Sequence, residues 1–447
     1  MRQLSTDKLN ELEKEFLADK KNIVAMNAAV QSGIRKVATD VNKIKANPYK
    51  FNIDIDNGCV CNQKASGRCW MFASLNFMRN VIIKKYNLEN FELSQSYPFF
   101  FDKLERSNYY FETVIEKADE PIEDRVMQYL MGDPLCDGGQ WDMFVNIVNK
   151  YGLVPKYVYP ETVASSNTRE LNKYLSKILR KNTVTLREAV KEGKSKAEVN
   201  ALKEEALQDV FNVLTATLGE LPESFDFIAH DKDHKLIEEK NLTPQNFFKK
   251  YVGLNLDDFV SIINAPTKDK PFNKTFTIKY LGNIVEGREV KHLNLKIEDL
   301  KRAIVKQLQD GMPVWFGCDV GKDMFTGDKD DKRATLAKDV IDYETLFDMD
   351  LEISKEDGLD YGYSLMTHAM TFTGVEMDGT KPVRFKVENS WGDEFGYKGH
   401  FVMSDEWFDS FVYQAVVDKK YLTKKEQEDY KKSPVELKPW DPMGSLA

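Results

Sequence analysis

The most informative segment of this 447-residue chain reads NQKASGRCWMFA and runs from residue 62 to residue 73. Gly67 and Arg68 precede Cys69, and a helical pattern of apolar residues continues from there to Lys85. Cys69 is therefore expected at a helix N-terminus, where unpaired backbone N–H groups lower the pKa of a thiol and favour the thiolate. The segment predicts a nucleophilic cysteine. Taken alone, the residue has a more common role as a buried structural cysteine.

A glutamine on the same loop adds a second catalytic element. Gln63 lies six residues before Cys69, on the loop that leads into the predicted helix. From there its side-chain amide can point at the same oxygen atom as the backbone N–H of Cys69. Two donors aimed at one developing negative charge form an oxyanion hole, which stabilises the tetrahedral intermediate of acyl transfer. Gln63 is therefore the candidate oxyanion-hole residue.

A thiol nucleophile needs a base, and the chain contains five histidines. His230 and His234 lie in a charged segment that favours exposure, and His292 has no distinctive context. His368 differs because it opens an apolar strand, expected over residues 369–376. A core histidine bonded to a backbone carbonyl is the plainer interpretation of His368 alone. Its place at a strand end nevertheless makes it the candidate base.

An orienting partner for the imidazole comes at the end of a second expected strand. The run over residues 383–388 is followed by Asn389, and Trp391 comes two residues later. Adjacent strands would bring the imidazole of His368 and the carboxamide of Asn389 side by side. The amide would then fix the tautomer of the imidazole, and the indole would shield the pair from water. The sequence thus predicts a Cys69–His368–Asn389 set.

Together these segments resemble the active-site blocks of the papain-like cysteine peptidases, in the same chain order. The blocks that carry the resemblance are residues 63–70, 366–369 and 388–392. A fourth block, CDGGQW at residues 136–141, resembles the glycine pair of that superfamily. The resemblance implies that Gly138 and Gly139 bind an extended substrate through their backbone, next to the scissile residue. A plain turn is the other interpretation of two adjacent glycines.

The spacing of the blocks narrows the resemblance to one branch of the superfamily. In ordinary papains the histidine and asparagine follow the cysteine by roughly 130–150 residues. Here His368 and Asn389 follow Cys69 by 299 and 320 residues, so a long insertion is expected between them. Residues 165–310 have the length and the helical pattern for it. This arrangement, with the C-terminal sequence PWDPMGSLA at residues 439–447, resembles the bleomycin hydrolase and aminopeptidase C family.

The resemblance implies a fold of the α+β class. It is the papain-like fold, with a helical left half and a β-barrel-like right half, enlarged by a helical insertion and by extensions at both ends. The expected parts of this single peptidase unit are an N-terminal extension at 1–58, a helical half with the nucleophile at 59–164, a mostly helical insertion at 165–310, a β half with the histidine and asparagine at 311–430, and a C-terminal arm at 431–447. Within the first part, apolar residues recur at helical spacing over residues 4–32.

The resemblance also implies what the arm and the site do. In that family the arm lies in the active-site cleft, and its terminal carboxylate, at Ala447 here, meets the α-ammonium of the substrate. The implied activity removes residues from the N-terminus of peptides. The Cys69 thiolate, paired with protonated His368, would attack the peptide carbonyl while Gln63 stabilises the oxyanion. Trp391, the glycine pair and Ala447 are the expected substrate-binding residues. The resemblance implies no metal or other cofactor, and it implies a homohexamer.

Three other functions remain open from the sequence. An endopeptidase on the same scaffold needs only a displaced arm or a wider cleft. A catalytically silent binding protein would keep the fold without turnover, although the complete cysteine, histidine and asparagine set argues against it. Nucleic-acid binding is poorly supported, because 63 Lys and Arg stand against 72 Asp and Glu, for a net charge of −9.

Composition and local patterns predict a cytoplasmic protein, and the resemblance implies peptides as its partners. Hydrophobic residues make up 42% of the chain, which allows a substantial core. No run approaches the roughly 18 apolar residues of a membrane span, and the first residues lack the apolar core of a secretory signal. Five cysteines are too few and too scattered for a disulfide framework. Cys59 and Cys61 are close together but lack the second ligand pair that a zinc site needs.

Overall fold

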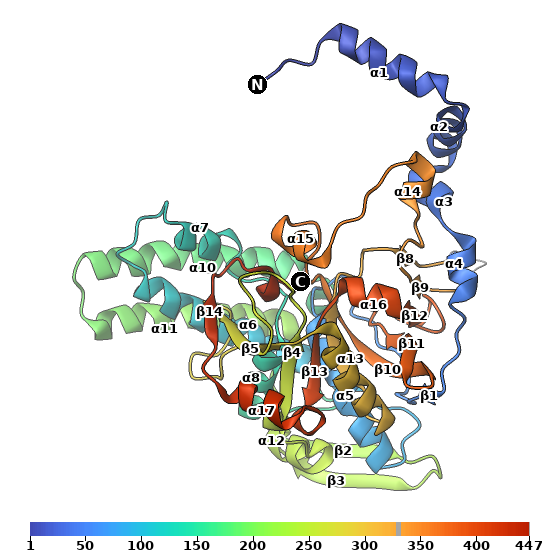
Figure 1. Cartoon of the computed structure of the whole chain (residues 1–447). Helices are drawn as coiled ribbons and strands as arrows, with labels where there is room; N and C mark the ends of the chain where they lie inside the picture. The colour runs from blue at the N-terminus through green and yellow to red at the C-terminus, as the bar shows by residue number, and fades with distance from the viewer. Residues whose placement is uncertain (328–331, 447) are drawn as a thin grey trace.

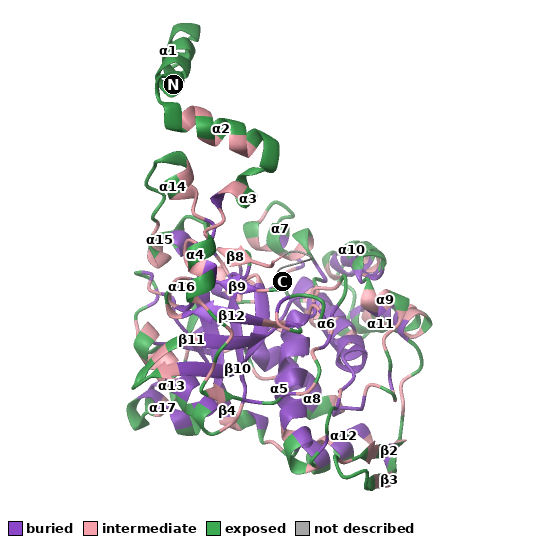
Figure 2. Ribbon diagram, turned by 90° about the vertical axis from the view of Figure 1, so that its right-hand side faces the viewer, coloured by how far each residue is buried: buried purple, intermediate pink, exposed green. Residues whose placement is uncertain are grey.

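Helix α5 (Cys69–Lys85) lies in the middle of the molecule, between a layer of helices and a large sheet (Figures 1 and 2). The computed structural model describes residues 1–327 and 332–446. The sequence of α5 is apolar on all sides, and almost every residue up to Ile83 is buried. A helix without a polar face has to be covered all round, and this places α5 between the two layers.

The helical layer is built outward from α5. Helix α8 (Trp141–Tyr151) packs on α5, α6 (Ser96–Glu116) packs on α8, and α10 (Arg169–Lys191) and α11 (Lys196–Leu218) pack on α6. The other α-helices are α1 (Thr6–Ala18), α2 (Lys20–Ser32), α3 (Ile34–Ala38), α4 (Val41–Ala46), α7 (Arg125–Gly132), α9 (Val163–Ser166), α12 (Pro244–Phe247), α13 (Ile297–Gln309), α14 (Tyr343–Phe347), α15 (Lys355–Asp360), α16 (Asp405–Phe411) and α17 (Lys424–Lys431). Four short helical turns are η1 (Phe248–Val252), η2 (Leu256–Asp258), η3 (Lys419–Tyr421) and η4 (Pro442–Gly444).

The large sheet has the strand order β14-β5-β6-β4-β13-β7-β10-β11-β12-β9-β8, with β1 paired to β10. Its strands are β1 (Ile53–Asp54), β4 (Phe259–Ile263), β5 (Lys274–Ile278), β6 (His292–Asn294), β7 (Val314–Cys318), β8 (Met324–Phe325), β9 (Thr335–Leu336), β10 (His368–Asp378), β11 (Lys381–Glu388), β12 (His400–Ser404), β13 (Val412–Asp418) and β14 (Val435–Leu437). Strands β2 (Phe225–His230) and β3 (Leu236–Leu242) form a separate antiparallel hairpin.

Strand β10 is the part of the sheet that positions the site. It pairs antiparallel with β7 on one side and with β11 on the other, and His368 lies opposite Cys318, the last residue of β7. Glu388, the last residue of β11, lies opposite Thr371. The start of one antiparallel strand lies beside the end of its neighbour. Residues that precede β10 and residues that follow β7 and β11 therefore meet where these three strands begin or end.

The predicted α+β fold class is confirmed: one half consists of helices, and the other is built on the large sheet, against which α13 and α16 pack (Figure 1). The helix that begins at the cysteine and the strand that begins at His368 are both present. The periodic segment at 4–32 forms two helices instead of one. Asp19 separates α1 from α2, because its side chain accepts a hydrogen bond from the backbone N–H of Lys21 (2.8 Å) and caps the second helix.

The region at 165–310 divides its residues between both halves. It contains α10 and α11, but also β4, β5 and β6 of the large sheet. Strand β4 pairs with β13, with Ile262 opposite Ala415. The apolar run that forms β4 is only a few residues long, and the period of so short a run does not distinguish a buried strand from a helix.

The two ends of the chain differ in their contact with the body. Helices α1 and α2 project away from the body of the molecule (Figure 1), and no described residue of either helix is buried. Near the other end, Met443 and Leu446 are buried in the core cluster that also contains Cys69. Across residues 1–327 and 332–446, no helix is both long enough and apolar enough to cross a membrane.

Candidate active site

Cys69 is the first residue of α5, and its side chain is fully buried. The helix starts here because the carbonyl of Arg68 accepts hydrogen bonds from the backbone N–H groups of Met71 and Phe72, both at 3.0 Å. The guanidinium of Arg68 is itself fully buried and donates to both carboxylate oxygens of Glu161, at 3.0 and 2.7 Å. The residue before the nucleophile is thus fixed by a two-pronged ion pair.

The Cys69 sulfur lies against the strand that carries the histidine. The backbone N–H of Ala369, the residue after His368, donates to Sγ at 3.4 Å. The imidazole Nε2 of His368 lies 2.8 Å from the amide oxygen Oδ1 of Asn389. With Nε2 occupied by this bond, Nδ1 is the ring nitrogen left to exchange a proton with the thiol. The structure thus brings the three residues of the predicted set together.

The indole of Trp391 covers the imidazole. The two ring centroids are 5.1 Å apart, and the ring planes are inclined by 36°. Asn62, on the loop before the nucleophile, forms an isolated β-bridge with Trp391. The indole therefore lies where it can keep water from the bond between His368 and Asn389.

Burial favours the neutral forms of both reacting groups. It raises the pKa of the Cys69 thiol to about 11, although the backbone N–H groups of Ala369, Trp70 and Cys69 itself favour the thiolate. Burial also lowers the pKa of His368 to about 4, against the opposing effect of the bond to Asn389. Burial thus opposes charge on both groups, whereas the backbone N–H groups at Sγ and the bond to Asn389 favour the thiolate and the imidazolium.

Gln63 lies on the loop that leads to Cys69, and both polar atoms of its amide have partners. The amide nitrogen Nε2 donates to the carbonyl of Ser66 (2.6 Å), and the oxygen Oε1 accepts a hydrogen bond from the hydroxyl of Ser390 (2.6 Å). A carboxamide nitrogen carries two hydrogens, so one remains for a developing oxyanion. Ser390 directly follows Asn389, and its bond to Gln63 joins the two sides of the cleft.

The glycine pair lies close to the nucleophile's helix. A side chain on Gly139 would place its Cβ only 2.6 Å from the indole ring of Trp70, so this position needs a glycine. The indole Nε1–H of Trp70 donates to the carbonyl of Asp137 (2.7 Å), and the guanidinium of Arg106 donates to the carbonyl of Gly138 (2.7 Å). The backbone of the pair is therefore held from two sides.

A buried carboxylate next to the glycine pair escaped the sequence analysis. Asp137 accepts hydrogen bonds from the backbone N–H of Gly67 (3.0 Å) and from the side chains of Asn172 (2.7 Å) and Thr168. Its ion pair with Lys103 is 2.8 Å long, and the ammonium is fully buried. Burial alone would raise the pKa of Asp137, but Lys103 and these bonds hold it well below its ordinary value.

A second buried ion pair joins α5 to the sheet. Arg79 of α5 pairs with Glu388, the last residue of β11, and both side chains are almost fully buried. Asn57 also donates to Glu388, at 2.6 Å. Arg79 is the only charged residue of α5 between Cys69 and Ile83, and this was the sequence signal for the pair, because a buried charge requires a partner.

The end of the chain reaches the cleft. The hydroxyl of Ser445 donates to the carbonyl of Met366 (3.1 Å), two residues before His368. Leu446 is only 6% exposed and belongs to the same cluster as Cys69. Ala447, the expected carboxylate of the arm, lies outside the described residues.

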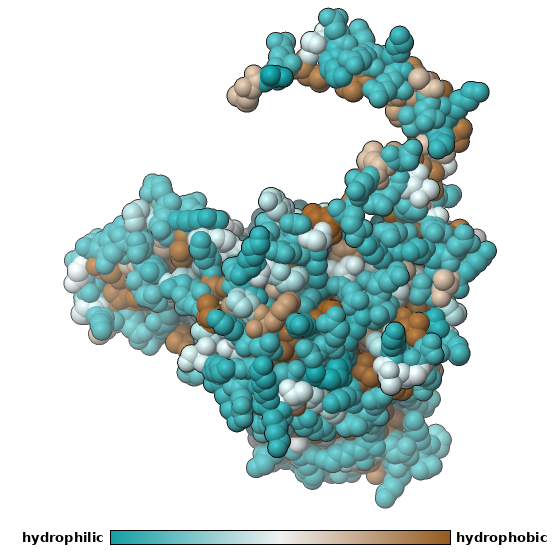
Figure 3. Space-filling model, viewed as in Figure 1, coloured by the Kyte–Doolittle hydropathy of each residue, from teal (hydrophilic) through white to brown (hydrophobic). Residues whose placement is uncertain are grey.

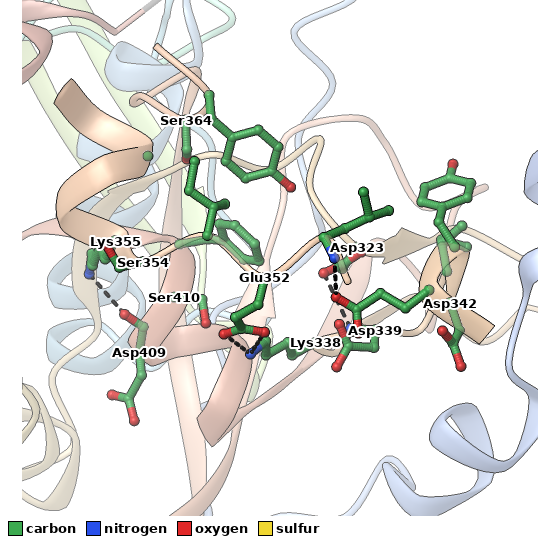
Figure 4. Close-up of a pocket in the computed structure, with 18 of the residues that line it drawn as sticks. Asp323, Lys338, Asp339, Asp342, Glu352, Ser354, Lys355, Ser364, Asp409 and Ser410 are labelled. Atoms are coloured by element: carbon green, nitrogen blue, oxygen red, sulfur yellow. Dashed lines mark hydrogen bonds and ion pairs between the residues drawn. The ribbon is translucent and has the colours of Figure 1, made fainter. Parts of the chain in front are cut away.

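A separate hollow lies behind the loop that leads to the histidine (Figure 4). Charged side chains line it, among them Lys338 and Glu352, whose ion pair is 2.8 Å long. On one wall Ser364 donates to the carboxylate of Asp319 (2.9 Å), which also accepts a bond from the hydroxyl of Thr367 (3.2 Å). This hollow supports the loop before the imidazole, and none of its described lining residues belongs to the predicted catalytic set.

Within the described residues, no cluster of three or more His, Cys, Asp or Glu side chains has the arrangement to hold a metal ion. Of the other histidines, His400 lies opposite Glu388, the residue before Asn389. His230 and His234 are exposed, as predicted. His292 is fully buried, and its Nδ1 bonds the hydroxyl of Ser261 (2.7 Å).

A cysteine at the start of a buried helix, facing a histidine–asparagine pair at the ends of two adjacent strands, defines the papain-like class of cysteine peptidases. The sequence matches the Peptidase C1-like family over residues 3–444. Aminopeptidase C from Lactobacillus delbrueckii subsp. lactis is 51% identical over 428 residues, which cover 95% of this chain and 94% of that protein. Aminopeptidase C from Streptococcus thermophilus is 47% identical over the full length of both chains.

More distant relatives and a solved structure agree. Bleomycin hydrolase from Mus musculus is 38% identical over 99% of each chain. The crystal structure of PepW from Lactobacillus rhamnosis HN001 superimposes with a TM-score of 0.97 at 46% identity, covering 100% of this chain and 99% of that one. The chain therefore belongs to the Peptidase C1-like family, in the branch of aminopeptidase C and bleomycin hydrolase. It is a cysteine-type aminopeptidase.

Proposed function

We propose that Cys69 is the nucleophile, His368 the base and acid, and Asn389 the residue that orients the imidazole. The observation that carries this assignment is the pair of contacts at the strand ends: Nε2 of His368 to Asn389 at 2.8 Å, and the N–H of Ala369 to the Cys69 sulfur at 3.4 Å. Gln63 and the backbone N–H of Cys69 stabilise the oxyanion.

The proposed reaction is acyl transfer through a thioester. Nδ1 of His368 takes the proton of the Cys69 thiol as Sγ attacks the carbonyl carbon of the first peptide bond. The imidazolium then gives this proton to the departing amine, and the C–N bond breaks. Next a water molecule gives a proton to His368, and its oxygen attacks the thioester. The free amino acid leaves, and the thiol regains its proton. This sequence consumes one water and needs no metal or other cofactor.

We infer that the C-terminal arm limits this reaction to the first residue of a peptide. The contact of Ser445 with Met366 and the burial of Leu446 support a cleft that is filled on one side of the nucleophile. Provided that Ala447 is the last residue, its carboxylate would meet the ammonium of a free N-terminus in a site of low dielectric, where such a pair is strong. Gly138, Gly139 and Trp391 hold and cover the substrate backbone in this proposal.

Assembly and location are part of the proposal as well. Exposed apolar side chains gather on α1 and α2 (Figure 3), and they include Leu9, Leu12, Phe16, Val24 and Val30. Such a face is costly to leave in water, and a second copy of the chain would cover it, which supports a homo-oligomer, a hexamer by family resemblance. Cys59, Cys61, Cys136 and Cys318 are free thiols, which supports a reducing cytoplasm.

The assignment of the nucleophile is tested by two alanine variants of neighbouring thiols. Cys69→Ala should lower turnover of free-amine peptides by more than about 10⁴-fold, because loss of a nucleophile removes the covalent route. Cys136→Ala is the matched control: its exposed thiol lies two residues before the glycine pair, and its removal should leave turnover unchanged. Activity that survives in Cys69→Ala and disappears in Cys136→Ala would reverse the assignment.

A further inference from the structure

The C-terminal arm is fastened to the body by a buried ion pair. Oδ2 of Asp441 lies 2.9 Å from the ammonium of Lys270, and the exposed fractions of the two side chains are 9% and 4%. A pair shielded from water in this way is screened little by solvent or salt, so its attraction persists where that of an exposed pair fades. Asp441 comes six residues before the end of the sequence and marks the last charged side chain of the arm.

Lys270 is held in place by the body, independently of the arm. Its backbone N–H donates to the carbonyl of Thr267 (3.0 Å), and its own carbonyl accepts a hydrogen bond from the side chain of Asn294 (2.6 Å). Its ammonium also pairs with Asp269 at 3.0 Å. The cation is thus presented by a fixed turn, and the arm has only to bring one carboxylate to it.

Asp441 lies where the arm leaves the sheet and turns toward the cleft. Before it, β14 pairs in parallel with β5 and so belongs to the sheet. After it, Oδ1 of Asp441 accepts a hydrogen bond from the backbone N–H of Met443 (2.9 Å) and turns the chain into the short helix η4. Two residues later Ser445 reaches Met366 beside the catalytic histidine. One carboxylate therefore fixes both the position of the arm and its direction into the cleft.

We propose that the Lys270–Asp441 ion pair is a latch that keeps the arm in the cleft and thereby decides whether the enzyme accepts only free N-termini. Both residues determine specificity without touching the substrate. The inference rests on the proposed gating by the arm. When the latch opens, residues 442–446 lose their fixed approach to the cleft while the catalytic set stays intact, and N-blocked or longer peptides gain access to Cys69.

Asp441→Asn is the most direct test. Asparagine has the same size and keeps the acceptor for Met443, and Lys270 keeps its bond to Asp269, so no charge is left unpaired. We expect cleavage of N-acetylated peptides to rise by about tenfold or more, because the neutral amide loses the charge attraction to Lys270 at a place where water screens it little. KM for free-amine peptides should rise, and kcat should change little because the catalytic residues are not altered.

Two matched variants separate the latch from a general loss of charge. Asp269→Asn removes the other carboxylate on Lys270 but does not belong to the arm. Glu436→Gln breaks a pair on the arm itself, with Lys279, whose side chains are 57% and 42% exposed. Both should leave cleavage of N-acetylated peptides at the level of the unaltered enzyme. Amide hydrogen exchange at residues 443–446 should accelerate in Asp441→Asn and in neither control.

Deletion of residues 442–447 distinguishes the Lys270–Asp441 latch from gating by the arm. If this deletion raises cleavage of N-acetylated peptides and Asp441→Asn does not, the latch is refuted and the gating arm stands. If the deletion itself leaves N-acetylated peptides uncleaved while free-amine peptides are still hydrolysed, gating by the arm is wrong, and the latch fails with it. A rise in both, with unchanged controls, is the result that the structure predicts.

Discussion

The two halves of the cleft hold their catalytic side chains by different means. On the helical half, buried charges fasten the segment around the nucleophile: Arg68 is paired before Cys69, and the Lys103–Asp137 pair reaches the same loop. On the sheet half, strand pairing places His368 at the start of β10, and the partner of its imidazole is a neutral amide.

This difference has consequences for what each half tolerates. Removing one member of a buried ion pair leaves the other buried without its partner. The stability of the helical half should therefore be sensitive to the loss of a charge. Acid should act on the sheet half, because it contains histidines that burial keeps neutral. Burial lowers the pKa of His292 to about 3, and that of His400 to about 4.

Lys103→Met should destabilise the protein most. It leaves Asp137 buried with hydrogen bonds but without its cation, and breaking such a pair costs about 3–5 kcal/mol. Denaturant unfolding measures the change. A loss below about 1 kcal/mol, as for an exposed pair, would mean that buried charge does not hold the helical half together.

Asn389→Ala should lower kcat by about 10–100-fold, the usual effect of losing the partner that orients a histidine. The strands that place His368 remain, so the unfolding midpoint should change little. Asn389→Asp is the matched control, since a carboxylate still accepts the Nε2–H bond and should recover most of the activity. Equal losses in both variants would show that orientation of the imidazole is not the role of Asn389.

Acidification from pH 7 to pH 5 should destabilise the sheet half selectively. The unfolded pKa of histidine is about 6.5 and the folded pKa of His292 about 3, so the unfolded chain binds a proton that the folded chain does not. Stability is therefore present above pH 6.5 and falls as the pH drops, by about 2 kcal/mol at pH 5 for one such residue. His292→Gln should lose less stability over this interval than the unaltered protein, whereas the exposed His234→Gln should lose as much.

Asp137 should contribute nothing to this acid effect. Its pKa is held below the ordinary carboxyl value in the folded protein, so it stays ionised in both states between pH 7 and pH 5. Its contribution disappears only below the unfolded value near pH 4. The contrast between the halves would be reversed if the loss of stability between pH 7 and pH 5 were absent in Lys103→Met and still present in His292→Gln.

Lys173→Met should have the smallest effect. Its pair with Glu170 on α10 is 3.8 Å long, and both side chains are about two-thirds exposed. Exposed pairs contribute from zero to about 1 kcal/mol, so the unfolding free energy should change by less than about 0.5 kcal/mol. A loss of unfolding free energy comparable to that of Lys103→Met would mean that the number of ion pairs, and not their burial, determines the stability of the helical half.

The sequence predicted the site better than the supports around it. Cys69, His368 and Asn389 are each marked by local context, a helix start or a strand end, and local context is what a single sequence contains. The partners of Asp137 and Glu388 come from segments far away in the chain, and no pattern within one segment reveals such a pairing. The buried charge of Arg79 on an apolar helix was a signal that a partner exists, but not which one.

The same contrast between local patterns and long-range pairing applies to the prediction of the fold. Long periodic segments such as α10 and α11 were predictable as helices, because the period of 3.6 is repeated several times. The short strands β4, β5 and β6 were assigned to a helical insertion, since their placement depends on pairing with distant strands such as β13. The latch at Lys270 was equally out of reach, because its turn and the arm meet only in three dimensions.

The most direct test of the central claim compares hydrolysis of the same fluorogenic peptides with a free and an N-acetylated N-terminus, with Cys69→Ala as the blank. The account predicts turnover of the free-amine peptides only, by a thiol-dependent enzyme whose arm excludes a blocked N-terminus. Comparable turnover of the acetylated peptides would contradict it and would define an endopeptidase whose arm leaves the cleft open.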